Sequence, residues 1–421
     1  MKNLLKKILP EFIFSGYHFC WAFFSAVFYG FPSRELKVIG VTGTDGKTTV
    51  VYLIYQMLNN LGYKTAFFSS GFYGINSQIW PNKYERTMPG WHIMQRFLRQ
   101  SVKASCQYVI IEVASGGIKQ HRHRFINFKT AILTNLTPEH IEESHKGSFA
   151  NYKETKGKLF QAVGPKGSII VNLDDEQAEY FLSFPAKEKW GYQIESRGQT
   201  QNLIRAENCN VNQDGISFRI NQIDFKLKFL GKFNIYNALA VVSVGLSEKI
   251  SLDKIRTSLG KAKPMPGRFE IVIKEPFIVI VDYALTPNAL EKVYSNIREI
   301  FRGRVIGVLG AAGGGRDKWK RPHLGQVAEK YLDKIILTNE DPYDEDPIVI
   351  INAIAQGAKG KPVEKIPDRR KAICYALKSA RPGDVVIITG KGGDSWMHFA
   401  KGKKVSWDDR EIIREELKQL T

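Results

Sequence analysis

Short apolar runs alternate with amphipathic stretches along most of this 421-residue chain. Between residues 37 and 173, the apolar runs have the length of buried strands, and most stretches between them repeat apolar residues every three or four positions, as helices do. Each strand of a parallel sheet is followed by such a crossover helix. We therefore predict a parallel sheet wrapped by helices, with strands at residues 37–41, 64–69, 107–113, 130–136 and 168–172.

The pattern changes near residue 202 and later returns to the alternating form. Short alternating runs flank Gln213-Asp214-Gly215, which is a hairpin turn signal, and a helix is predicted at 234–246. Residues 261–267 hold two prolines and two lysines and have the composition of a linker. A second array follows, with strands predicted at 277–281, 304–309, 334–338 and 384–388 and helices at 287–300, 324–331, 348–356 and 368–379.

The predicted fold class is therefore α/β, with three parts along the chain. Residues 37–262 are expected to form a central domain on a parallel sheet. Residues 263–421 are expected to form a C-terminal, Rossmann-like doubly wound domain. Residues 1–36 precede both domains as a basic and aromatic segment.

The N-terminal segment is unusual in composition. Lys2, Lys6 and Lys7 precede residues 12–31, which contain ten Phe, Tyr or Trp residues and no Asp, Glu, Lys or Arg. A signal peptide would need a small-residue cleavage site, and none is clear. A spanning helix is long enough, but the lysines would then place the rest of the chain outside the cell. We favour an aromatic segment that lies at a membrane surface or packs on the protein body.

Composition limits the classes of partner. Apolar residues make up 43% of the chain and charged residues 24%, as in globular domains with real cores. The net charge of +19 favours nucleotides, phosphorylated substrates or an acidic membrane surface, whereas no arginine-rich tract indicates nucleic acid. The four cysteines are scattered, which is typical of a reducing compartment and argues against disulfides or zinc. We expect a cytoplasmic monomer, peripheral to the inner face of the membrane if residues 1–36 bind it.

The most specific motif is a glycine-rich loop between a predicted strand and a predicted helix. Residues 40–49 read Gly-Val-Thr-Gly-Thr-Asp-Gly-Lys-Thr-Thr. Such a P-loop presents backbone N–H groups to phosphate oxygens, with a lysine that reaches the β- and γ-phosphates and a hydroxyl that binds Mg²⁺. The central domain is thus of the P-loop ATPase type. Its predicted ATP-binding residues are Gly43, Thr44, Asp45, Gly46, Lys47, Thr48 and Thr49.

Four further motifs follow in order along the central domain. They are Glu112-Val-Ala-Ser-Gly-Gly, Thr134-Asn-Leu-Thr-Pro-Glu-His140, Tyr152-Lys-Glu-Thr-Lys156 and Gly231-Lys-Phe-Asn234-Ile-Tyr-Asn237. Together with the P-loop they resemble the Mur ligase family, and within it the UDP-N-acetylmuramyl-tripeptide synthetases, over roughly residues 37–421. The resemblance implies an ATP-dependent ligase that joins a muramyl-peptide carboxylate to an amino acid through an acyl phosphate, in peptidoglycan synthesis.

The resemblance assigns metal-binding roles to several of these residues. In the family, the residues at Glu112 and His140 bind a second Mg²⁺, which suits a reaction that brings two anions together. The family's lysine at Lys156 is carbamylated, which replaces a positive charge by an oxygen ligand. We expect Lys47, Glu112, His140 and Lys156 to be catalytic, and Thr48, Glu112, His140 and Lys156 to bind metal. The alternatives are an exposed glutamate, a plain surface histidine and a solvated lysine.

The resemblance also places residues around the rest of the nucleotide. Asn234 and Asn237 correspond to asparagines near the adenine, and their spacing puts both amides on one helical face. A helix-capping role for Asn234 is the alternative. Arg268 corresponds to an arginine that reaches the phosphates, and Asp282 to a residue near the nucleotide.

The substrate motifs match the family less well. Thr87 and Arg122 match its acceptor-binding motifs, and segments 313–322, 340–343 and 390–394 correspond to the site for the incoming amino acid. Enzymes that add diaminopimelate usually carry Asp-Asn-Pro-Arg and Gly-Lys-Gly-His-Glu where this chain has Glu-Asp-Pro-Tyr and Gly-Lys-Gly-Gly-Asp. The family's UDP-binding N-terminal domain is missing from the sequence. The predicted substrate-binding residues are Thr87, Arg122, Arg316, Asp341, Tyr343, Gly390 and Asp394.

These departures predict an active ligase whose acceptor or amino acid differs from the best-known pair. We expect a basic diamino acid without an obligatory distal carboxylate, because Tyr343 replaces the arginine that would bind one. Glu340 and Asp341, beside it, are two acids that could hold a second ammonium group. One alternative is a ligase that extends folates with glutamate on the same scaffold. Another is an ATP-binding, membrane-associated relative without catalytic activity.

Overall fold

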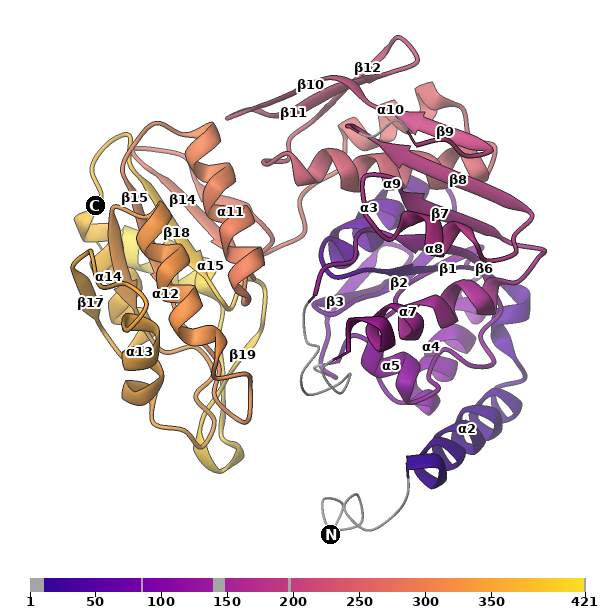
Figure 1. Cartoon of the computed structure of the whole chain (residues 1–421), viewed down its shortest axis with the longest axis horizontal. Helices are drawn as coiled ribbons and strands as arrows, with labels where there is room; N and C mark the ends of the chain where they lie inside the picture. Colours follow the sequence, from indigo (N-terminus) through magenta and orange to yellow (C-terminus); the bar gives the residue numbers. More distant parts are fainter. Residues whose placement is uncertain (1–10, 85, 139–147, 196–197, 420–421) are drawn as a thin grey trace. The chain divides into compact units, whose positions relative to one another are not determined.

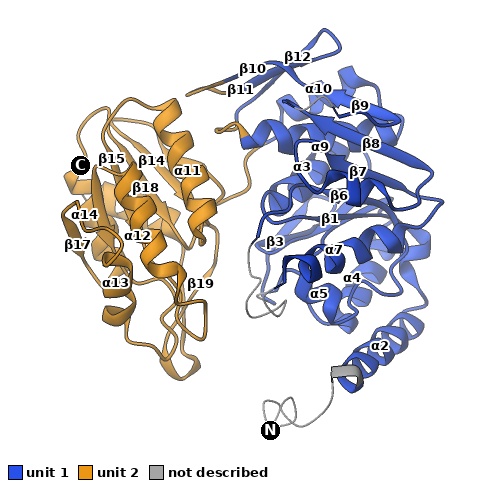
Figure 2. Cartoon of the chain, in the orientation of Figure 1, with its two compact units in different colours: residues 1–210, 216–228, 233–262 blue, residues 211–215, 229–232, 263–421 orange. Residues whose placement is uncertain are grey.

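The computed structural model of the chain describes residues 11–84, 86–138, 148–195 and 198–419. The chain divides into two compact units, drawn in blue and orange in Figure 2. Unit 1 comprises residues 1–210, 216–228 and 233–262, and unit 2 comprises residues 211–215, 229–232 and 263–421.

Unit 1 is built on a nine-stranded sheet in the order β4-β3-β2-β5-β1-β6-β7-β8-β9. The seven strands β2-β5-β1-β6-β7-β8-β9 run parallel to one another. At one edge, β3 pairs antiparallel with β2, and β4 pairs antiparallel with β3. The bounds are β1 Lys37–Thr42, β2 Thr65–Phe68, β3 Phe72–Ile75, β4 Gln78–Pro81, β5 Tyr108–Glu112, β6 Phe128–Leu133, β7 Ser168–Asn172, β8 Glu188–Gln193 and β9 Asn202–Arg205.

Helices cover both faces of this sheet (Figure 1). On one face the apolar sides of β1, β5, β6 and β7 pack with residues of α4 and α7 to form the main core of the unit. The helices of this face are α4 Trp91–Lys103, α5 Ser115–Lys119 and α7 Phe149–Val163. The other face is covered by α3 Lys47–Asn60 and α9 Phe233–Ser247, and α10 Leu252–Gly260 packs on these two helices. The short α8 Ala178–Leu182 follows β7. A β-meander of β10 Glu207–Asn212, β11 Gly215–Ile220 and β12 Ile223–Leu227 precedes α9, with the predicted turn between β10 and β11.

The aromatic N-terminal segment forms helix α2, Glu11–Phe28, which packs against α4. The 3₁₀ helix η1, Pro32–Glu35, joins α2 to β1. Among the described residues, no helix is long and apolar enough to cross a bilayer.

Unit 2 is built on a six-stranded sheet in the order β13-β14-β18-β15-β16-β17, in which only the edge pair β13–β14 is antiparallel. The strands are β13 Glu270–Ile273, β14 Ile278–Asp282, β15 Val305–Leu309, β16 Lys334–Leu337, β17 Val363–Lys365 and β18 Val385–Thr389. The helices α14 Arg369–Ser379 and α15 Asp409–Lys418 cover one face and supply six of the fourteen buried residues of a core cluster. The helices α11 Pro287–Ile300, α12 Lys320–Tyr331 and α13 Pro347–Ala355 pack side by side, and β19 Trp396–His398 pairs with β20 Lys404–Ser406, close to η2 Ala400–Gly402.

The strand and helix predictions hold for the central elements and are wrong at the sheet edges. The antiparallel strands β3, β4 and β13 were not predicted, so neither sheet is wholly parallel. The strand predicted at 130–136 ends at Leu133, because the next residues bend to hydrogen-bond the P-loop. Thr44 N–H donates to the carbonyl of Asn135 at 2.9 Å, and Thr137 N–H to the Thr44 hydroxyl at 3.0 Å.

Candidate active site

The P-loop lies between β1 and α3 and requires two of its glycines. Gly43 has φ 152° and Gly46 has φ 77°, a backbone region that favours glycine. A Cβ on Gly43 would lie 1.9 Å from Thr134 Oγ1, and one on Gly46 would lie 2.6 Å from Asn237 Oδ1. The loop therefore follows a path that only glycine allows, pressed against the segment after β6 and against α9.

Hydrogen bonds hold this loop in shape. Asp45 N–H donates to Asn135 Oδ1 at 2.9 Å, and the Thr134 hydroxyl donates to the Asp45 carbonyl at 2.6 Å. Lys47, the first residue of α3, donates from Nζ to the Thr44 carbonyl at 2.7 Å. The lysine ammonium thus lies over the loop whose backbone is shaped to receive phosphate.

Glu112 is a buried carboxylate next to the P-loop. It ends β5 and pairs in register with Val41 of β1, which brings it to the same sheet edge as the loop. Its side chain is only 2% exposed. Its Oε2 accepts from the Thr48 hydroxyl at 2.9 Å and from Ser70 N–H at 2.9 Å, and its Oε1 accepts from the Ser70 hydroxyl at 2.8 Å. The Thr87 hydroxyl bonds Ser70 Oγ at 2.9 Å.

The Thr48 and Glu112 oxygens have the donor chemistry that Mg²⁺ prefers. Magnesium in phosphoryl-transfer sites is usually held by one or two protein oxygens together with substrate phosphates and water. A cluster of three or more acidic, histidine or cysteine side chains able to hold a metal is absent from the described residues. His140, one of the two further predicted ligands, lies outside the described residues.

Lys156 lies at the P-loop although it is distant from it in sequence. Its side chain, from the middle of α7, is 1% exposed and donates from Nζ to the Gly43 carbonyl at 2.7 Å. The Nζ atom also lies 4.5 Å from the centre of the Tyr152 ring. The structure therefore contradicts the alternative of a solvated lysine and brings Lys156, Gly43 and Thr48 into one site.

The two asparagines of α9 lie on one helical face, as predicted. Both are buried, and Asn237 Nδ2 donates to Asn234 Oδ1 at 2.8 Å. Asn237 also packs against Gly46 of the P-loop. The pair is within reach of the nucleotide-binding loop of the same unit.

The predicted acceptor residues form a second group in unit 1. Thr87 joins Glu112 through Ser70. Arg122 is buried and turned inward, donating to the carbonyl of Met88 and to the side chain of Gln120. Burial, together with the nearby Arg86, lowers the pKa of Arg122 to about 10. Arg122 thus braces the Thr87–Met88 segment in this structure.

In unit 2, Asp282 lies at the carboxyl end of β14. It accepts from Phe269 N–H at 2.7 Å and from Ala284 N–H at 2.8 Å. Burial raises the pKa of Asp282, although Arg268 acts in the opposite direction. The Arg268 guanidinium stacks over the Tyr283 ring at 4.2 Å. This carboxylate therefore orders the turn that carries the predicted phosphate-binding arginine.

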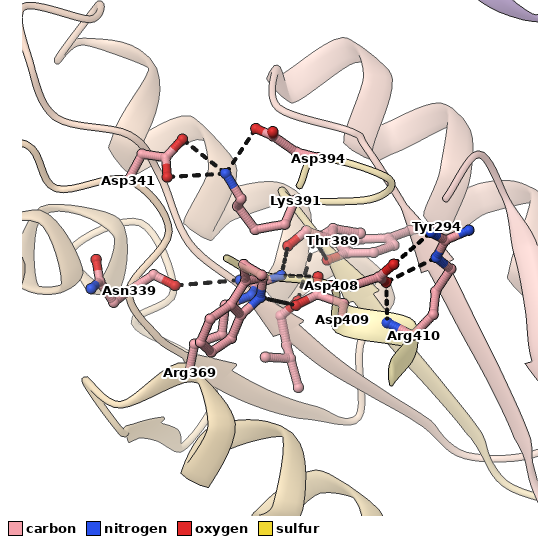
Figure 3. A network of polar contacts seen from close by, with 12 residues as sticks. Tyr294, Asn339, Asp341, Arg369, Thr389, Lys391, Asp394, Asp408, Asp409 and Arg410 are labelled. Atoms are coloured by element: carbon pink, nitrogen blue, oxygen red, sulfur yellow. Dashed lines mark hydrogen bonds and ion pairs between the residues drawn. The ribbon is translucent and has the colours of Figure 1, made fainter. Parts of the chain in front are cut away.

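Figure 3 shows a charged cluster at the ends of β16 and β18. Lys391 Nζ lies 3.0 Å from both carboxylate oxygens of Asp341 and 2.8 Å from Asp394 Oδ2. His398 N–H also donates to Asp341 Oδ1, at 2.9 Å. Burial acts to lower the pKa of Lys391, but Asp341 and Asp394 together raise it. Asp341 is thus engaged by a lysine, which corrects the expectation that Glu340 and Asp341 are both available to an ammonium group.

The remaining predicted substrate-binding residues border this cluster. The Tyr343 ring stacks on His398 with centroids 5.0 Å apart, and its φ of 51° turns the chain there. Burial raises the pKa of the Tyr343 hydroxyl, and the nearby exposed Arg316 acts in the opposite direction. Gly390 follows β18, and a Cβ there would lie 2.9 Å from Glu340 Oε2.

Ser70 was missed as a site residue in the sequence, whereas Glu340 was expected to face an ammonium group. Ser70 bridges Glu112 and Thr87 but carries no motif of its own. Glu340 is 2% exposed, and its Oε2 accepts no hydrogen bond from the described residues. Burial raises the pKa of Glu340, and so does Asp341. Glu340 follows a predicted strand directly and precedes Asp341, so the sequence already placed it in the segment expected to bind the incoming amino acid.

Family models match most of both units. The model described as "Mur ligase middle domain" matches residues 41–245, and "Mur ligase, glutamate ligase domain" matches residues 267–392. The UDP-N-acetylmuramyl-tripeptide synthetase of Roseiflexus sp. (strain RS-1) is 34% identical over 94% of this chain and 81% of its own length. The UDP-N-acetylmuramoyl-L-alanyl-D-glutamate–2,6-diaminopimelate ligase of Syntrophomonas wolfei is 36% identical over 94% and 81%.

The chain belongs to the Mur ligase family. It is accordingly an ATP-dependent ligase that forms carbon–nitrogen bonds. This outcome confirms the predicted family and the predicted enzyme class.

Solved structures share the fold of this Mur ligase. A structure of a UDP-N-acetylmuramoyl-L-alanyl-D-glutamate–2,6-diaminopimelate ligase is 26% identical, with a TM-score of 0.63 over 91% of this chain and 79% of that one. Mycobacterium tuberculosis folylpolyglutamate synthase with ADP has a TM-score of 0.74 over 92% and 94%, but only 18% identity. The second likeness shows the fold alone, so it does not favour folate chemistry.

The unpartnered Glu340 generates a stability prediction. The pKa of Glu340 is raised in the folded protein. Its neutral carboxyl group therefore favours folding at a pH below the unfolded pKa of about 4.3, and this contribution is lost as the pH rises through the folded pKa. Glu340→Gln should therefore stabilise unit 2 at pH 8 by about 1 kcal/mol or more, and by much less near pH 4. Urea denaturation at both pH values measures this.

The exposed Glu299 of α11 provides the matched control. Glu299→Gln should change the free energy of unfolding by less than about 0.5 kcal/mol at either pH. A Glu340→Gln variant that is less stable than wild type at pH 8 would contradict the interpretation of Glu340 as a costly buried charge.

Proposed function

We propose that this Mur ligase activates the carboxylate of a muramyl-peptide acceptor as an acyl phosphate and joins it to the amine of a diamino acid, in peptidoglycan synthesis in the cytoplasm. The observation that carries the proposal is the group around the P-loop of unit 1. Thr48 bonds Glu112 there, and Lys156 bonds Gly43. Similarity to tripeptide synthetases and diaminopimelate ligases supports the acceptor and the pathway.

In the first step, an acceptor carboxylate oxygen attacks the γ-phosphorus of ATP, and the bond to the β-phosphate oxygen breaks to release ADP. Backbone N–H groups of the P-loop hold the phosphates, and Lys47 offsets their charge. Thr48 and Glu112 would hold Mg²⁺, which when bound offsets charge on the phosphate oxygens. Glu112 is kept ready for this by three hydrogen bonds that orient both of its oxygens.

In the second step, the amine nitrogen attacks the acyl carbon. The bond from that carbon to the phosphate oxygen breaks, inorganic phosphate leaves, and the nitrogen loses a proton. The amide then joins acceptor and amino acid. Exclusion of water protects the acyl phosphate from hydrolysis before the amine arrives.

Lys156 is proposed to act as a carbamate. Its neutral amine adds to CO₂, and the loss of one proton leaves a negatively charged carbamate. The carbamate nitrogen keeps one N–H, which can still donate to the Gly43 carbonyl that Lys156 bonds now. Its new oxygens would lie beside the P-loop with the Thr48 and Glu112 oxygens, where a negative ligand suits a cation.

The charged cluster of unit 2 is proposed to select the amino acid. Lys391 bonds Asp341 and Asp394. Glu340 Oε2, by contrast, accepts no hydrogen bond from the described residues and interacts with Lys320 and Arg369 only through space. Tyr343, stacked on His398, presents no positive charge. A side chain ending in an ammonium group suits this cluster better than one that also carries a carboxylate. Arg316 is proposed to bind the α-carboxylate.

Residues 1–36 are proposed to contact a membrane surface and to make the enzyme peripheral to its inner face. The aromatic composition of the segment and the lysines before it support this proposal. One side of α2 packs on α4. Packing on the protein body and contact with a membrane surface are therefore compatible for this segment.

The ligase activity is tested by product formation. The protein, ATP, a UDP-linked muramyl-dipeptide acceptor and a panel of amino acids should yield a ligated product and ADP in equal amounts. Lys47→Ala should reduce turnover by a factor of about 10² or more, because charge stabilisation of the transferring phosphoryl group is lost. Lys166→Ala, at an exposed lysine before β7, is the control and should keep wild-type turnover. Glutamate addition to folates without any muramyl product would replace the proposal with the folate alternative.

The carbamate is tested by chemical rescue. Lys156→Ala should lose turnover by a factor of about 10² or more, and short carboxylic acids should restore part of it by supplying an oxygen ligand. The wild type should lose activity in CO₂-free buffer and regain it with bicarbonate. The control is Lys158→Ala, an exposed lysine on the same helix. Activity of Lys156→Ala equal to that of wild type would exclude the carbamate.

The amino-acid preference is tested by kcat/KM. Lysine or ornithine should be preferred over diaminopimelate. The double variant Asp341→Asn/Tyr343→Arg should shift the ratio towards diaminopimelate by about 10- to 100-fold, since a hydrogen bond to a charged group contributes about 1.5–3 kcal/mol. Asp344→Asn makes the same acid-to-amide change at an exposed position and should leave the ratio unchanged. A strong wild-type preference for diaminopimelate would show that another cation binds its distal carboxylate.

A further inference from the structure

Helix α2 carries a continuous aromatic face that unit 1 leaves exposed. Tyr17, Trp21, Phe24 and Phe28 are exposed by 54, 49, 62 and 77%, respectively. Their spacing of four, three and four residues places them along one side of the helix. Ile13 and Val27 widen this face, and Phe19 and Phe23 border it, partly exposed and packed edge-on against the Phe125 ring. An exposed apolar patch of this kind on a folded domain marks a site of interaction with a membrane, another protein or a ligand.

The opposite side of α2 fixes the helix on unit 1. Ala22, Ser25 and Ala26 are buried, and the helix packs on α4. At its carboxyl end, Arg99 of α4 donates to the Tyr29 carbonyl at 2.9 and 2.6 Å. Tertiary contacts on the packed side therefore fix the orientation of α2, and with it the exposure of the aromatic face.

The same helix contacts the segment that carries the proposed acceptor residues. Ser15 Oγ bonds His121 Nε2 at 2.7 Å, one residue before Arg122. The Tyr17 and His18 rings lie 6.1 and 5.1 Å from the ring of Trp91. Trp91 Nε1 donates to the Gln120 carbonyl at 2.6 Å, and the Gln120 side chain accepts from Arg122. One layer of side chains thus joins the aromatic face to the acceptor-binding group.

The composition of the face favours a lipid surface as its occupant. Six of the eight exposed large apolar residues on and beside it are aromatic, and Tyr and Trp prefer the interface between water and lipid. After Glu11, α2 contains no acidic residue, and Lys2, Lys6 and Lys7 precede it in the sequence. Arg124 and Lys158 are exposed, and both lie near His121. Burial lowers the pKa of His121 most, and these two cations lower it further. Cations around an aromatic face complement an anionic bilayer, on which such a helix lies flat.

We propose that the exposed face of α2 binds the surface of an anionic bilayer and that the acceptor of this ligase is a muramyl peptide carried in that bilayer on a lipid. The acceptor half rests on the proposed function. Binding through α2 places the Thr87–Arg122 group near the lipid head groups, where the peptide of such an acceptor lies. The local acceptor concentration then rises because both partners share one surface.

The first experiment measures binding to vesicles. The full chain should co-sediment with vesicles of phosphatidylcholine and phosphatidylglycerol, and far less with phosphatidylcholine alone or at high salt. Trp21→Gln/Phe24→Gln/Phe28→Gln should bind at least tenfold more weakly, with an unchanged melting temperature. Ile348→Gln/Val349→Gln removes two exposed apolar side chains from α13 and should bind as wild type. Failure of the wild type to co-sediment, or a dimer that the triple variant dissociates, would overturn the proposal.

The second experiment compares acceptors. With a lipid-linked muramyl dipeptide in the same vesicles, the triple variant should lose at least tenfold in kcat/KM relative to wild type. With the soluble UDP-linked acceptor it should stay within twofold. Equal losses with both acceptors would overturn the bilayer role and leave the ligase assignment intact. Absence of product from wild type with either acceptor would overturn the acceptor half together with the proposed function, while the sedimentation result would still decide the bilayer contact.

Discussion

The parallel alignment of β1 with β5 and β6 is the constraint on which the unit 1 site depends. Parallel strands end at one edge of the sheet, so the P-loop, Glu112 and Thr134 emerge side by side although they lie about 70 and 90 residues apart in the chain. Val41 pairs with Glu112, and Thr42 pairs with Leu133. A slip of one residue would turn Glu112 to the other face of the sheet and break its contact with Thr48.

The same edge concentrates groups that cost the fold free energy. Glu112 is buried as a carboxylate, and the P-loop passes Thr134 so closely that Gly43 cannot carry a side chain. Unit 2 repeats the arrangement with Asp282, Glu340 and the cluster around Lys391. Burial disfavours each charge, so the hydrogen bonds and ion pairs around them offset a penalty that an apolar core would not have. Such costs are common where a protein must bind a charged ligand.

Helix α2 shows how a single element can serve packing and binding together. Its small residues, Ala22 and Ala26, are buried on the side that packs on α4, and the rings of Trp21, Phe24 and Phe28 remain largely exposed. The contacts of Ser15 and Tyr17 tie that orientation to the turn that holds Arg122. The exposed patch and the segment proposed to bind the acceptor are thereby joined by direct contacts within unit 1.

The local sequence determined the central strands, most of the helices and the P-loop, because apolar periodicity and glycine placement act over a few residues. The motif resemblance identified the family and singled out Lys156, which the fold places at the P-loop. Only the tertiary structure decided the antiparallel edges, since β3, β4 and β13 are short and depend on neighbours for their pairing. It alone showed that Ser70 bridges Glu112 and Thr87, that Lys391 occupies Asp341, and which side of α2 is exposed. These are contacts between residues far apart in the chain, and no local pattern encodes a partner that folding brings from another element.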